Sequence, residues 1–269
     1  MTYETLACRM DGRVAVVTLN RPDVLNAINK KMIAETKALM TDLIADSQVR
    51  AIVIHGAGRA FSAGFDLKES AQVSYSGVAQ WQEVLERDFE FIMQFWDCPK
   101  PTIAAVHGHC LAGAFEMALA CDVTVAADTT KFGEPEVRFG AGIVAMILPW
   151  ATGPKAAKEL LMTGNDRVTA EDALRMGIVN RVVPAGEELD EAIRIAKDMS
   201  AAVASAVQSI KRTINRTYDI RGFREAMRTS LEADLIMSVT GSAEKDEFNQ
   251  IRRERGLKAA LEWRDAKFR

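Results

Sequence analysis

The sequence predicts an α/β protein with a helical C-terminal region, and three features of its hydrophobic pattern indicate this class. Apolar runs of strand length recur up to residue 184, amphipathic segments of helix length separate them, and only helical periodicity continues from residue 187. Strands that alternate with helices are typical of an α/β core. We therefore expect a core over residues 1–200 and a helical region over 201–269 that covers the core and assists oligomerisation.

The first seventy residues are expected to form a hairpin, a helix and a buried strand. Two strand-like segments flank Asp11-Gly12, a dipeptide that favours a tight hairpin turn. Pro22 ends this pattern, because neither proline nor the residue before it readily continues regular structure. Apolar residues at helical spacing predict a helix from Lys30 to Ala45, the run AIVIHG predicts a strand at 51–56, and a loop is expected over 57–70.

The same alternation continues through the middle of the chain. It predicts a helix at 78–97, a strand at 102–108, a helix at 112–121, a strand at 123–128 and a turning segment at 131–142. Two or three helices up to Met176 and a strand at 177–184 complete the expected core, and residues 187–269 keep helical periodicity.

Two stretches of the helical region carry apolar stripes with charged flanks, namely Phe223, Met227, Leu231 and Leu235 in one and Phe248 and Ile251 in the other. Helices with such stripes either cover the core of their own chain or pack against another subunit. The first arrangement is the more frequent for any one stripe, and the sequence leaves both open. The length of the helical tail favours an oligomer.

Composition and charge exclude several classes of function. The 269 residues are 48% hydrophobic and 26% charged, as in ordinary globular proteins, and the net charge of −3 indicates neither a nucleic acid nor an anionic membrane as partner. No apolar run approaches the ~18 residues of a membrane span, and the acidic N-terminus is unlike a signal peptide. The four scattered cysteines are expected to be reduced, buried thiols of a cytoplasmic protein, and no Cys/His cluster or His-Glu-x-x-His motif predicts a metal site.

Two segments rich in glycine and alanine follow early strands, at Phe61–Leu67 and at His109–Glu116. Small residues let a backbone approach a ligand closely and leave its amides free to donate. In a helix that begins near Ala112, the Gly113 amide lies in the first turn, where N–H groups lack partners within the helix. One amide from each segment would form an oxyanion hole for a carbonyl oxygen that becomes an enolate. Glycine after a strand also serves in turns and close packing, so that alternative stays open.

Five motifs together resemble the crotonase (enoyl-CoA hydratase/isomerase) superfamily over essentially the full length of the chain. They are NRPDVLNAIN at 20–29, FSAGFDLKE at 61–69, AAVHGHCLAGAFEMALACD at 104–122, KFGEPEVRFG at 131–140, and the run A-x-x-A-L-x-x-G-I-V-N-x-V-V-P that ends at Pro184. The resemblance implies a crotonase-like spiral of repeated ββα units followed by a helical region. It also implies an acyl-CoA thioester as ligand, and a homotrimer or dimer of trimers as assembly.

The resemblance assigns roles to residues of both small-residue segments. It implies that the backbone amides of Phe65 and Gly113 donate to the thioester oxygen, and that Glu116 and Glu136 hold the attacking water between them. It further implies contacts to the CoA adenine and pantetheine from two segments, with Lys68 near the CoA phosphates. The residues expected to bind CoA are Leu25, Ala27, Ala63, Asp66, Leu67 and Lys68.

Two carboxyl groups suit the addition of water to an α,β-unsaturated thioester. One orients and deprotonates the water that attacks Cβ, while the other, or the same one, supplies the proton at Cα. In a partly dry site the two raise each other's pKa, so acid and base coexist near neutral pH. Taken alone, Glu136 would be a solvated turn residue, and its match to the family's F-G-x-x-E position reverses that interpretation. We expect no cofactor, since coenzyme A is part of the substrate.

The expected activity is that of a hydro-lyase, an enoyl-CoA hydratase of fatty acid metabolism that converts a trans-2-enoyl-CoA to the 3-hydroxyacyl-CoA. Two other enzymatic reactions remain open, namely hydration with retro-aldol cleavage of a hydroxycinnamoyl-CoA, and double-bond isomerisation through Glu136 alone. A non-catalytic CoA-thioester-binding scaffold is the alternative from another class. Retention of both glutamates argues against it.

The chain departs from the family pattern at two places. Alanines at 112 and 114 stand where the family commonly has glycine, and their methyl groups are expected to narrow the approach to the thioester. After Gly140 the apolar run AGIVAMILPWATG replaces a Pro-Gly-rich turn, so the acyl specificity does not carry over. Four aromatic residues either line the acyl site or pack in the core: Phe65, Phe115, Phe139 and Trp150. Asp66 is expected to brace its loop, His107 to make a structural hydrogen bond, and His109 to lie near the pocket.

Overall fold

Six strands rich in valine, isoleucine and alanine form the main sheet of the computed structural model, which describes residues 3–71, 75 and 77–268. The strands lie in the order β1 (Leu6–Asp11), β2 (Val14–Leu19), β3 (Ala51–Gly56), β4 (Thr102–Val106), β6 (Val123–Ala127) and β9 (Arg181–Val183). The first pair is antiparallel and the remaining pairs are parallel. Parallel strands are typically buried on both faces, which explains their continuous apolar runs.

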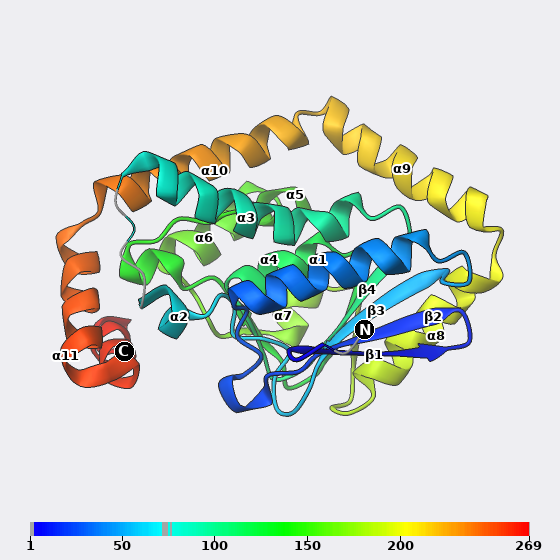
Figure 1. Cartoon of the computed structure of the whole chain (residues 1–269), viewed down its shortest axis with the longest axis horizontal. Helices are drawn as coiled ribbons and strands as arrows, with labels where there is room; N and C mark the ends of the chain where they lie inside the picture. The colour runs from blue at the N-terminus through cyan, green and yellow to red at the C-terminus, as the bar shows by residue number, and fades with distance from the viewer. Residues whose placement is uncertain (1–2, 72–74, 76, 269) are drawn as a thin grey trace.

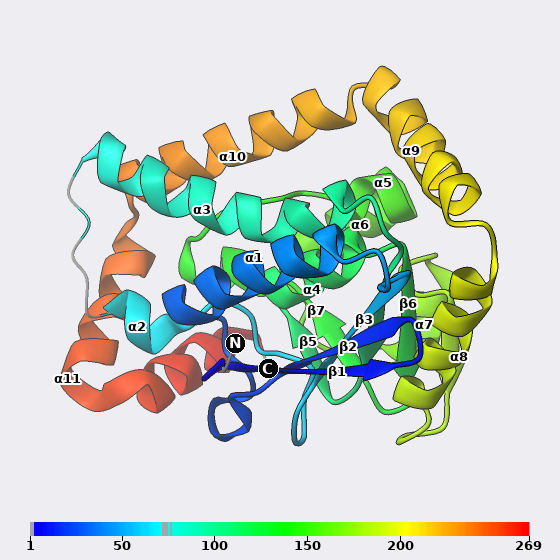
Figure 2. The ribbon, with the colours of Figure 1, turned by 45° about the vertical axis from the view of Figure 1, so that its right-hand side comes forward.

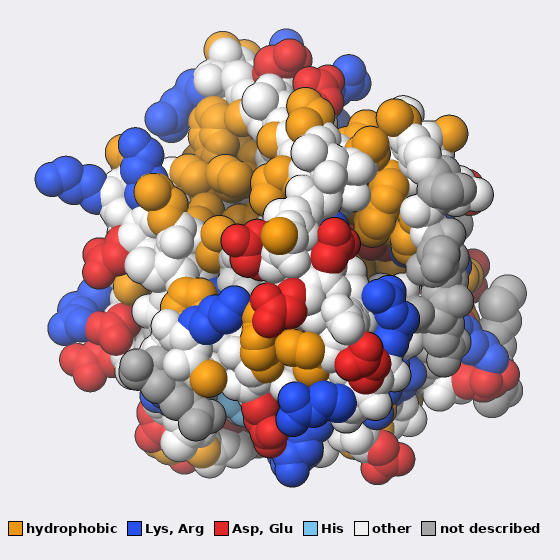
Figure 3. All heavy atoms as spheres, turned by 90° about the vertical axis from the view of Figure 1, so that its left-hand side faces the viewer, with side chains coloured by type: hydrophobic (Ala, Val, Ile, Leu, Met, Phe, Trp, Pro, Cys, Tyr) orange, Lys and Arg blue, Asp and Glu red, His pale blue; other side chains and the backbone are white. Residues whose placement is uncertain are grey.

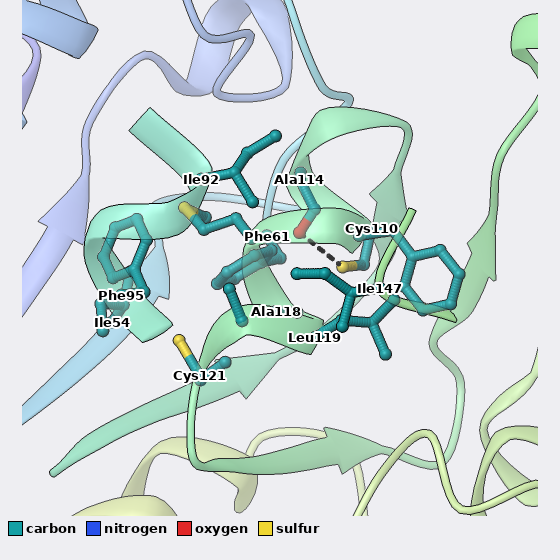
Figure 4. Packing of buried hydrophobic residues seen from close by; sticks show 14 of the residues in the cluster. Ile54, Phe61, Ile92, Phe95, Cys110, Ala114, Ala118, Leu119, Cys121 and Ile147 are labelled. Atoms are coloured by element: carbon teal, nitrogen blue, oxygen red, sulfur yellow. Dashed lines mark hydrogen bonds between the residues drawn. The ribbon is translucent and has the colours of Figure 1, made fainter. Parts of the chain in front are cut away.

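Helices cover both faces of this sheet. One face packs against α8 (Glu188–Ala201) through Ala192, Ile193 and Ala196. The other face packs against α1 (Lys30–Ala45), α3 (Val78–Asp97) and α4 (Gly113–Ala120). All eight residues of α4 are buried, so this helix is the centre of the core; Figure 4 shows Ala114, Ala118 and Leu119 among its large neighbours.

A second, three-stranded sheet holds the chain around α4. It consists of β5 (His109–Leu111), β7 (Lys131–Gly133) and β8 (Val168–Thr169), in that order. Strand β5 leads directly into α4, and η2 (Glu136–Phe139) follows β7. The pairing of β5 with β7, which aligns Leu111 with Gly133, therefore places the start of α4 close to the segment that carries Glu136.

The C-terminal helices wrap around the core. After α9 (Ala204–Ile220), helix α10 (Phe223–Thr240) runs beside α3, and α11 (Ala243–Asp265) with η3 (Ala266–Phe268) lies against η2 and α2 (Leu67–Ala71), as Figures 1 and 2 show. Phe223, Met227 and Phe248 are buried within the chain. Of the two uses foreseen for the apolar stripes, these residues thus serve the core of their own chain.

The structure confirms the predicted hairpin, the predicted helices at 30–45, 78–97 and 112–121, and the parallel strands. It also confirms the α/β class with a helical C-terminal region. The remaining elements of the core are η1 (Pro22–Val24), α5 (Leu148–Thr152), α6 (Pro154–Thr163) and α7 (Ala170–Arg175). The three-stranded sheet was not foreseen, because strands of two or three residues leave no periodicity to detect. The loop expected over 57–70 is wrong at its end, where α2 begins at Leu67.

The cysteines differ in part from expectation. Cys98, Cys110 and Cys121 are buried free thiols, and Figure 4 shows the Cys110 Sγ directed at the carbonyl oxygen of Ala114, 3.5 Å away. Cys8 is exposed, contrary to the prediction, because it lies on β1, the edge strand of the sheet, four of whose six residues are exposed. In the described part of the chain, no helix is both long and apolar enough to cross a membrane.

Candidate active site

The two segments expected to bind CoA lie side by side. The Ala63 amide donates to the Leu25 carbonyl at 3.0 Å, and the Ile28 amide donates to the Gly64 carbonyl at 2.8 Å. Leu25 and Asn26 both adopt a positive φ of 53°, a left-handed turn that brings the chain back toward the second segment. The structure thus joins segments that are far apart in sequence into one surface.

The Asn26 side chain fixes this turn from within. It is fully buried, and its Nδ2 donates to the carbonyl oxygens of Ala57, Ala60 and Phe61 at 2.8–3.1 Å. Its Oδ1 accepts from the Arg21 amide at 2.9 Å. A buried amide with all these partners specifies one loop conformation, because any other would leave polar groups unpaired.

Asp66 braces the second segment, as expected. Its Oδ2 pairs with Nη1 of Arg21 at 2.8 Å, and its Oδ1 accepts the amides of Lys68 and Glu69 at 3.0 and 3.2 Å, which caps α2. Burial raises the pKa of Asp66, but the Arg21 bond and the two amide bonds outweigh burial and hold the pKa below its usual value. The side chain of Lys68 is exposed at the start of α2.

The candidate oxyanion amides lie in adjoining loops. A Cβ built on Gly64 would lie 3.2 Å from the amide nitrogen of Gly113, so the two loops touch at this glycine. Within the described residues neither the Phe65 amide nor the Gly113 amide donates to a protein acceptor. Gly113 is the first residue of α4, where the free N–H groups and the helix dipole favour negative charge.

Ala112, which precedes this helix, has a strained backbone. Its φ of 58° and ψ of −138° lie in a region that glycine occupies readily and alanine does not. Its amide donates to the Gly133 carbonyl at 2.9 Å and its carbonyl accepts from the Glu116 amide at 3.1 Å. The surrounding bonds therefore hold Ala112 in the conformation that aims the Gly113 amide.

Glu116 and Glu136 are both buried, with 2% and 9% of their surface exposed. Glu116 lies in the first turn of α4, and its Oε1 accepts the Ala145 amide at 3.4 Å. Glu136 opens η2. One oxygen of each carboxyl group, Oε2, is buried and has no partner in the described residues. Such oxygens are available to a water molecule or a ligand.

Burial raises the pKa of both groups. Burial in the core and the nearby Glu136 raise the pKa of Glu116 well above its usual value, against the hydrogen bond from Ala145. Burial likewise raises the pKa of Glu136 to about 8. Because neighbouring carboxylates repel each other, such groups lose their protons in separate steps. The arrangement can hold a proton donor and a proton acceptor side by side.

Three further carboxyl groups, which the sequence did not indicate, lie around this pair. Glu134 is 1% exposed, and burial, Glu116 and Glu136 raise its pKa well above its usual value. Asp88 on α3 and Asp234 on α10 are also buried and act electrostatically on Glu116. Glu134 lies within the same motif as Glu136, and no local signal indicated that both side chains would be buried. Asp88 and Asp234 each lie in a helical segment, and the apolar pattern of those segments did not indicate that the two carboxyl groups would be buried.

The remaining candidates are placed as follows. His107 makes the expected structural contact, since its Nε2 lies 3.0 Å from the Gly58 carbonyl. A hollow of about 180 Å³ is lined by Leu25, Arg59, Gly108, His109, Thr129 and Lys131, so His109 does border a pocket. Phe115 packs on Phe132 in the core, while Trp150 packs on Tyr218 and Phe223. Phe139 stacks on Phe248 at 5.5 Å between ring centres.

Comparisons with known proteins agree with this geometry. A family model described as enoyl-CoA hydratase/isomerase matches residues 9–269. A probable enoyl-CoA hydratase of Mycobacterium bovis is 40% identical over 226 residues, which are 81% of this chain and 84% of the relative. The crotonyl-CoA hydratase of Syntrophomonas wolfei is 34% identical and covers 100% of this chain and 99% of its own.

Solved structures give the same result for the fold. An enoyl-CoA hydratase/isomerase from Xanthobacter autotrophicus Py2 superposes with a TM-score of 0.98, at 47% identity and with 100% of both chains covered. An enoyl-CoA hydratase from Mycobacterium smegmatis superposes with a TM-score of 0.90, at 26% identity, over 98% of this chain and 94% of the other.

Proposed function

The chain belongs to the enoyl-CoA hydratase/isomerase family, and on this premise we propose that it is a hydro-lyase that adds water across the double bond of a trans-2-enoyl-CoA. The observation that carries the proposal is the pair of buried carboxyl groups, Glu116 and Glu136, each with an unpartnered oxygen. The amides of Phe65 and Gly113 add support, since neither donates to an acceptor within the described residues. The relatives named as hydratases support the same reaction.

The amides of Phe65 and Gly113 would receive the thioester oxygen. When water attacks Cβ, negative charge moves onto this oxygen, and fixed donors stabilise it without having to reorganise. One well-placed donor of this kind contributes about 3–4 kcal/mol to the transition state. The Gly113 amide is additionally aligned with the N-terminal end of the α4 dipole.

The carboxyl groups of Glu116 and Glu136 would handle the protons. The ionised member accepts a proton from water as its oxygen attacks Cβ, and a carboxylic acid delivers a proton to Cα of the enolate. The raised pKa values keep at least one member of the pair protonated near neutral pH, and loss of a proton from the other member would supply the base. This chemistry requires no cofactor besides the CoA of the substrate.

The CoA moiety would lie along the joined segments that contain Leu25, Ala27, Ala63, Asp66 and Leu67. Support comes from their adjacency and from the exposed Lys68 at the start of α2, which is free to meet a phosphate. Asp66 would contribute through the position of α2, since both of its oxygens are engaged within the protein.

We further propose a homotrimer or dimer of trimers that acts in the cytoplasm in fatty acid metabolism. An assembly is supported by large apolar side chains that α9 and α10 leave exposed: Ile210, Ile214, Ile220, Ile236, Met237 and Val239. Figure 3 shows hydrophobic side chains gathered in a hollow in the upper part of the face at the left of Figure 1. Light scattering of the purified protein would give the number of subunits.

A panel of thioesters tests the reaction. The purified protein is incubated with crotonyl-CoA, with a longer trans-2-enoyl-CoA and with feruloyl-CoA, and loss of conjugation is followed by absorbance with products identified by mass. We expect the enoyl-CoAs to gain the mass of one water. If both remain unchanged while feruloyl-CoA yields an aldehyde, the protein is a hydratase-lyase. If all bind and none reacts, it is a thioester-binding scaffold.

A further inference from the structure

Residues 141–145 connect both candidate glutamates to the C-terminal helix α10. At the start of this segment the Ala141 amide donates to the Glu136 carbonyl at 3.1 Å. At its end the Ala145 amide donates to Oε1 of Glu116 at 3.4 Å. The segment therefore touches the backbone of one catalytic candidate and the carboxyl group of the other, and its position controls the second contact.

Two side chains of α10 hold the middle of the segment. Oδ1 of Asp234 accepts the Gly142 amide at 3.1 Å, and Oγ of Ser230 donates to the Ile143 carbonyl at 2.7 Å. Ser230 and Asp234 are four residues apart, so they lie on the same face of the helix. Both are buried, with 7% and 4% exposed. The helix thus binds two successive residues of the segment, one through its N–H and one through its C=O.

The fit at Gly142 leaves little freedom for movement. A Cβ on this residue would lie 2.6 Å from Oδ1 of Asp234 and 2.7 Å from its Cγ, so the carboxyl group lies directly against the glycine backbone. Beyond it, Val144 and Ala145 are buried. The position of the Ala145 amide is therefore set by α10 from one side and by the core from the other.

The contact that this anchoring controls is easily lost. A typical N–H···O bond has a donor–acceptor distance of about 2.9 Å, and the bond weakens steeply as the distance grows. The Ala145 amide, at 3.4 Å, already lies beyond the usual limit of about 3.2 Å. Among the described residues it is the one hydrogen-bond donor to the Glu116 carboxyl group. A small outward shift of the segment would leave Glu116 without any donor.

We propose that Ser230 and Asp234 are positioning residues for Glu116, acting through the segment 141–145. Glu116 would then depend on a helix that lies about a hundred residues later in the chain. The proposal rests on the assignment of Glu116 to the chemistry, and it adds the residues that hold the Ala145 amide against that carboxyl group.

The charges around Glu116 fix the direction of the expected effect. The carboxyl groups of Glu136, Asp234 and Asp88 favour the protonated form of Glu116, and Glu116 in turn raises the pKa of Glu134. The cations nearby belong to other partners: Arg87 pairs with Asp88 at 2.7 Å, and Lys245 acts on Asp234. The bond from the Ala145 amide opposes these carboxyl groups and favours ionised Glu116. Loss of that bond would raise the pKa of Glu116 further.

Ser230→Ala tests the proposal with little risk to folding, because alanine is a good helix former. With crotonyl-CoA as probe, we expect kcat to fall on the order of tenfold, with a smaller change in KM, and the acid limb of the kcat–pH profile to move to higher pH. Ser230→Thr keeps a hydroxyl and should restore most of kcat. Asp234→Asn keeps an oxygen for the Gly142 amide and should not move the acid limb to higher pH. Thr229→Ala, whose hydroxyl bonds within its own helix, is the matched control.

A second measurement separates this proposal from the proposed function. The titration of the Glu116 carboxyl carbon is followed by ¹³C NMR, assigned with Glu116→Gln, in wild type and in Ser230→Ala. An upward shift of its midpoint in the variant supports the positioning role even if no enoyl-CoA reacts. An unchanged midpoint, or a loss of activity that follows only the folded fraction, overturns it. Failure of the wild type to hydrate any enoyl-CoA overturns the proposed function instead.

Discussion

A Cβ atom on Gly64 would lie 2.6 Å from the Cβ of Ala112, so the loops that present the two candidate oxyanion amides meet at these residues. Gly64 also has a φ of 86°, which side-chain-bearing residues rarely adopt. The site therefore depends on a residue without a side chain at the point where its two halves touch.

Gly64→Ala should separate the two loops. We expect most of the turnover of crotonyl-CoA to be lost, because the new methyl group would also lie 2.8 Å from the Leu111 carbonyl oxygen. Gly12→Ala is the matched control, since Gly12 has a φ of 61° but nothing within 4 Å of a Cβ. Gly12→Ala should lower the free energy of unfolding by about 1–2 kcal/mol and leave turnover intact. Equal turnover in the two variants would contradict the close approach.

Ala112→Gly should stabilise the protein. The strained φ of 58° is natural for glycine, and relief of about 1–3 kcal/mol exceeds the added entropy of the unfolded chain of about 1 kcal/mol. Urea denaturation measures the difference. Ala114→Gly, in the first turn of α4, is the control and should destabilise by about 1 kcal/mol. A matching loss in both variants would show that Ala112 carries no strain.

Glu116→Gln and Glu136→Gln should each lower kcat by about 10²–10⁴-fold while the fold persists, because each removes a group that transfers a proton. Circular dichroism verifies the fold, and single-turnover kinetics with crotonyl-CoA give the rate. Glu134→Gln is the informative comparison, since Glu134 is equally buried but has no assigned role. It should retain turnover within about tenfold. Full activity in Glu116→Gln would remove that residue from the mechanism.

The free energy of unfolding should fall as the pH rises from 4.5 to about 8, the range over which Glu136 holds a proton in the folded state alone. The pKa of Glu136 is about 8 in the folded protein and 4.5 for an unperturbed glutamate, so between these limits the folded state keeps a proton that the unfolded state has released. This contribution to stability is complete below pH 4.5 and is lost as the pH approaches 8. Glu136→Gln should therefore gain stability relative to wild type across this window, by a few kcal/mol at most. Urea midpoints at several pH values measure the gain, and a constant difference would refute it.

Lys211→Met should destabilise the attachment of α9 to the core. Nζ of Lys211 donates to Asp122 at 2.7 Å and to the carbonyl oxygens of Lys100 and Phe95 at 3.1 and 3.3 Å, and its side chain is 8% exposed. Because the Asp122 side chain is 24% exposed, loss of its partner should cost less than in a fully buried pair, about 1–3 kcal/mol. Lys258→Met, at a side chain that is 91% exposed, is the control and should change the unfolding free energy by less than about 1 kcal/mol. A similar effect of both would argue against a buried pair.

Local patterns were sufficient for much of the fold. The helix at Lys30–Ala45 and the strand at 51–56 have the bounds that their periodicity predicts, because each buries a continuous apolar face. Asp11-Gly12 forms the expected turn between β1 and β2. The strands of the three-stranded sheet were not predicted, because segments of two or three residues are too short to show a periodic pattern. Pairing with neighbouring strands holds them in place.

The candidate site divides in the same way. The motifs identified Glu116, Glu136 and the loops of Phe65 and Gly113, and the structure places these loops in contact. Glu134 was missed, because a glutamate beside a proline in a charged stretch has no local reason to be buried. Its burial follows from the approach of β7 and η2 to α4.

The sequence by itself determined the α/β class, the principal helices and strands, and the family with its two glutamates, since all of these are written in local spacing and motif order. The tertiary structure alone decided which carboxyl groups share one buried site and that Ser230 and Asp234 hold the segment that meets Glu116. The residues that these two contacts join are separated in the sequence by 87 and 92 positions. Periodicity describes one element at a time, whereas the burial and pKa of a side chain depend on whatever the rest of the chain packs against it.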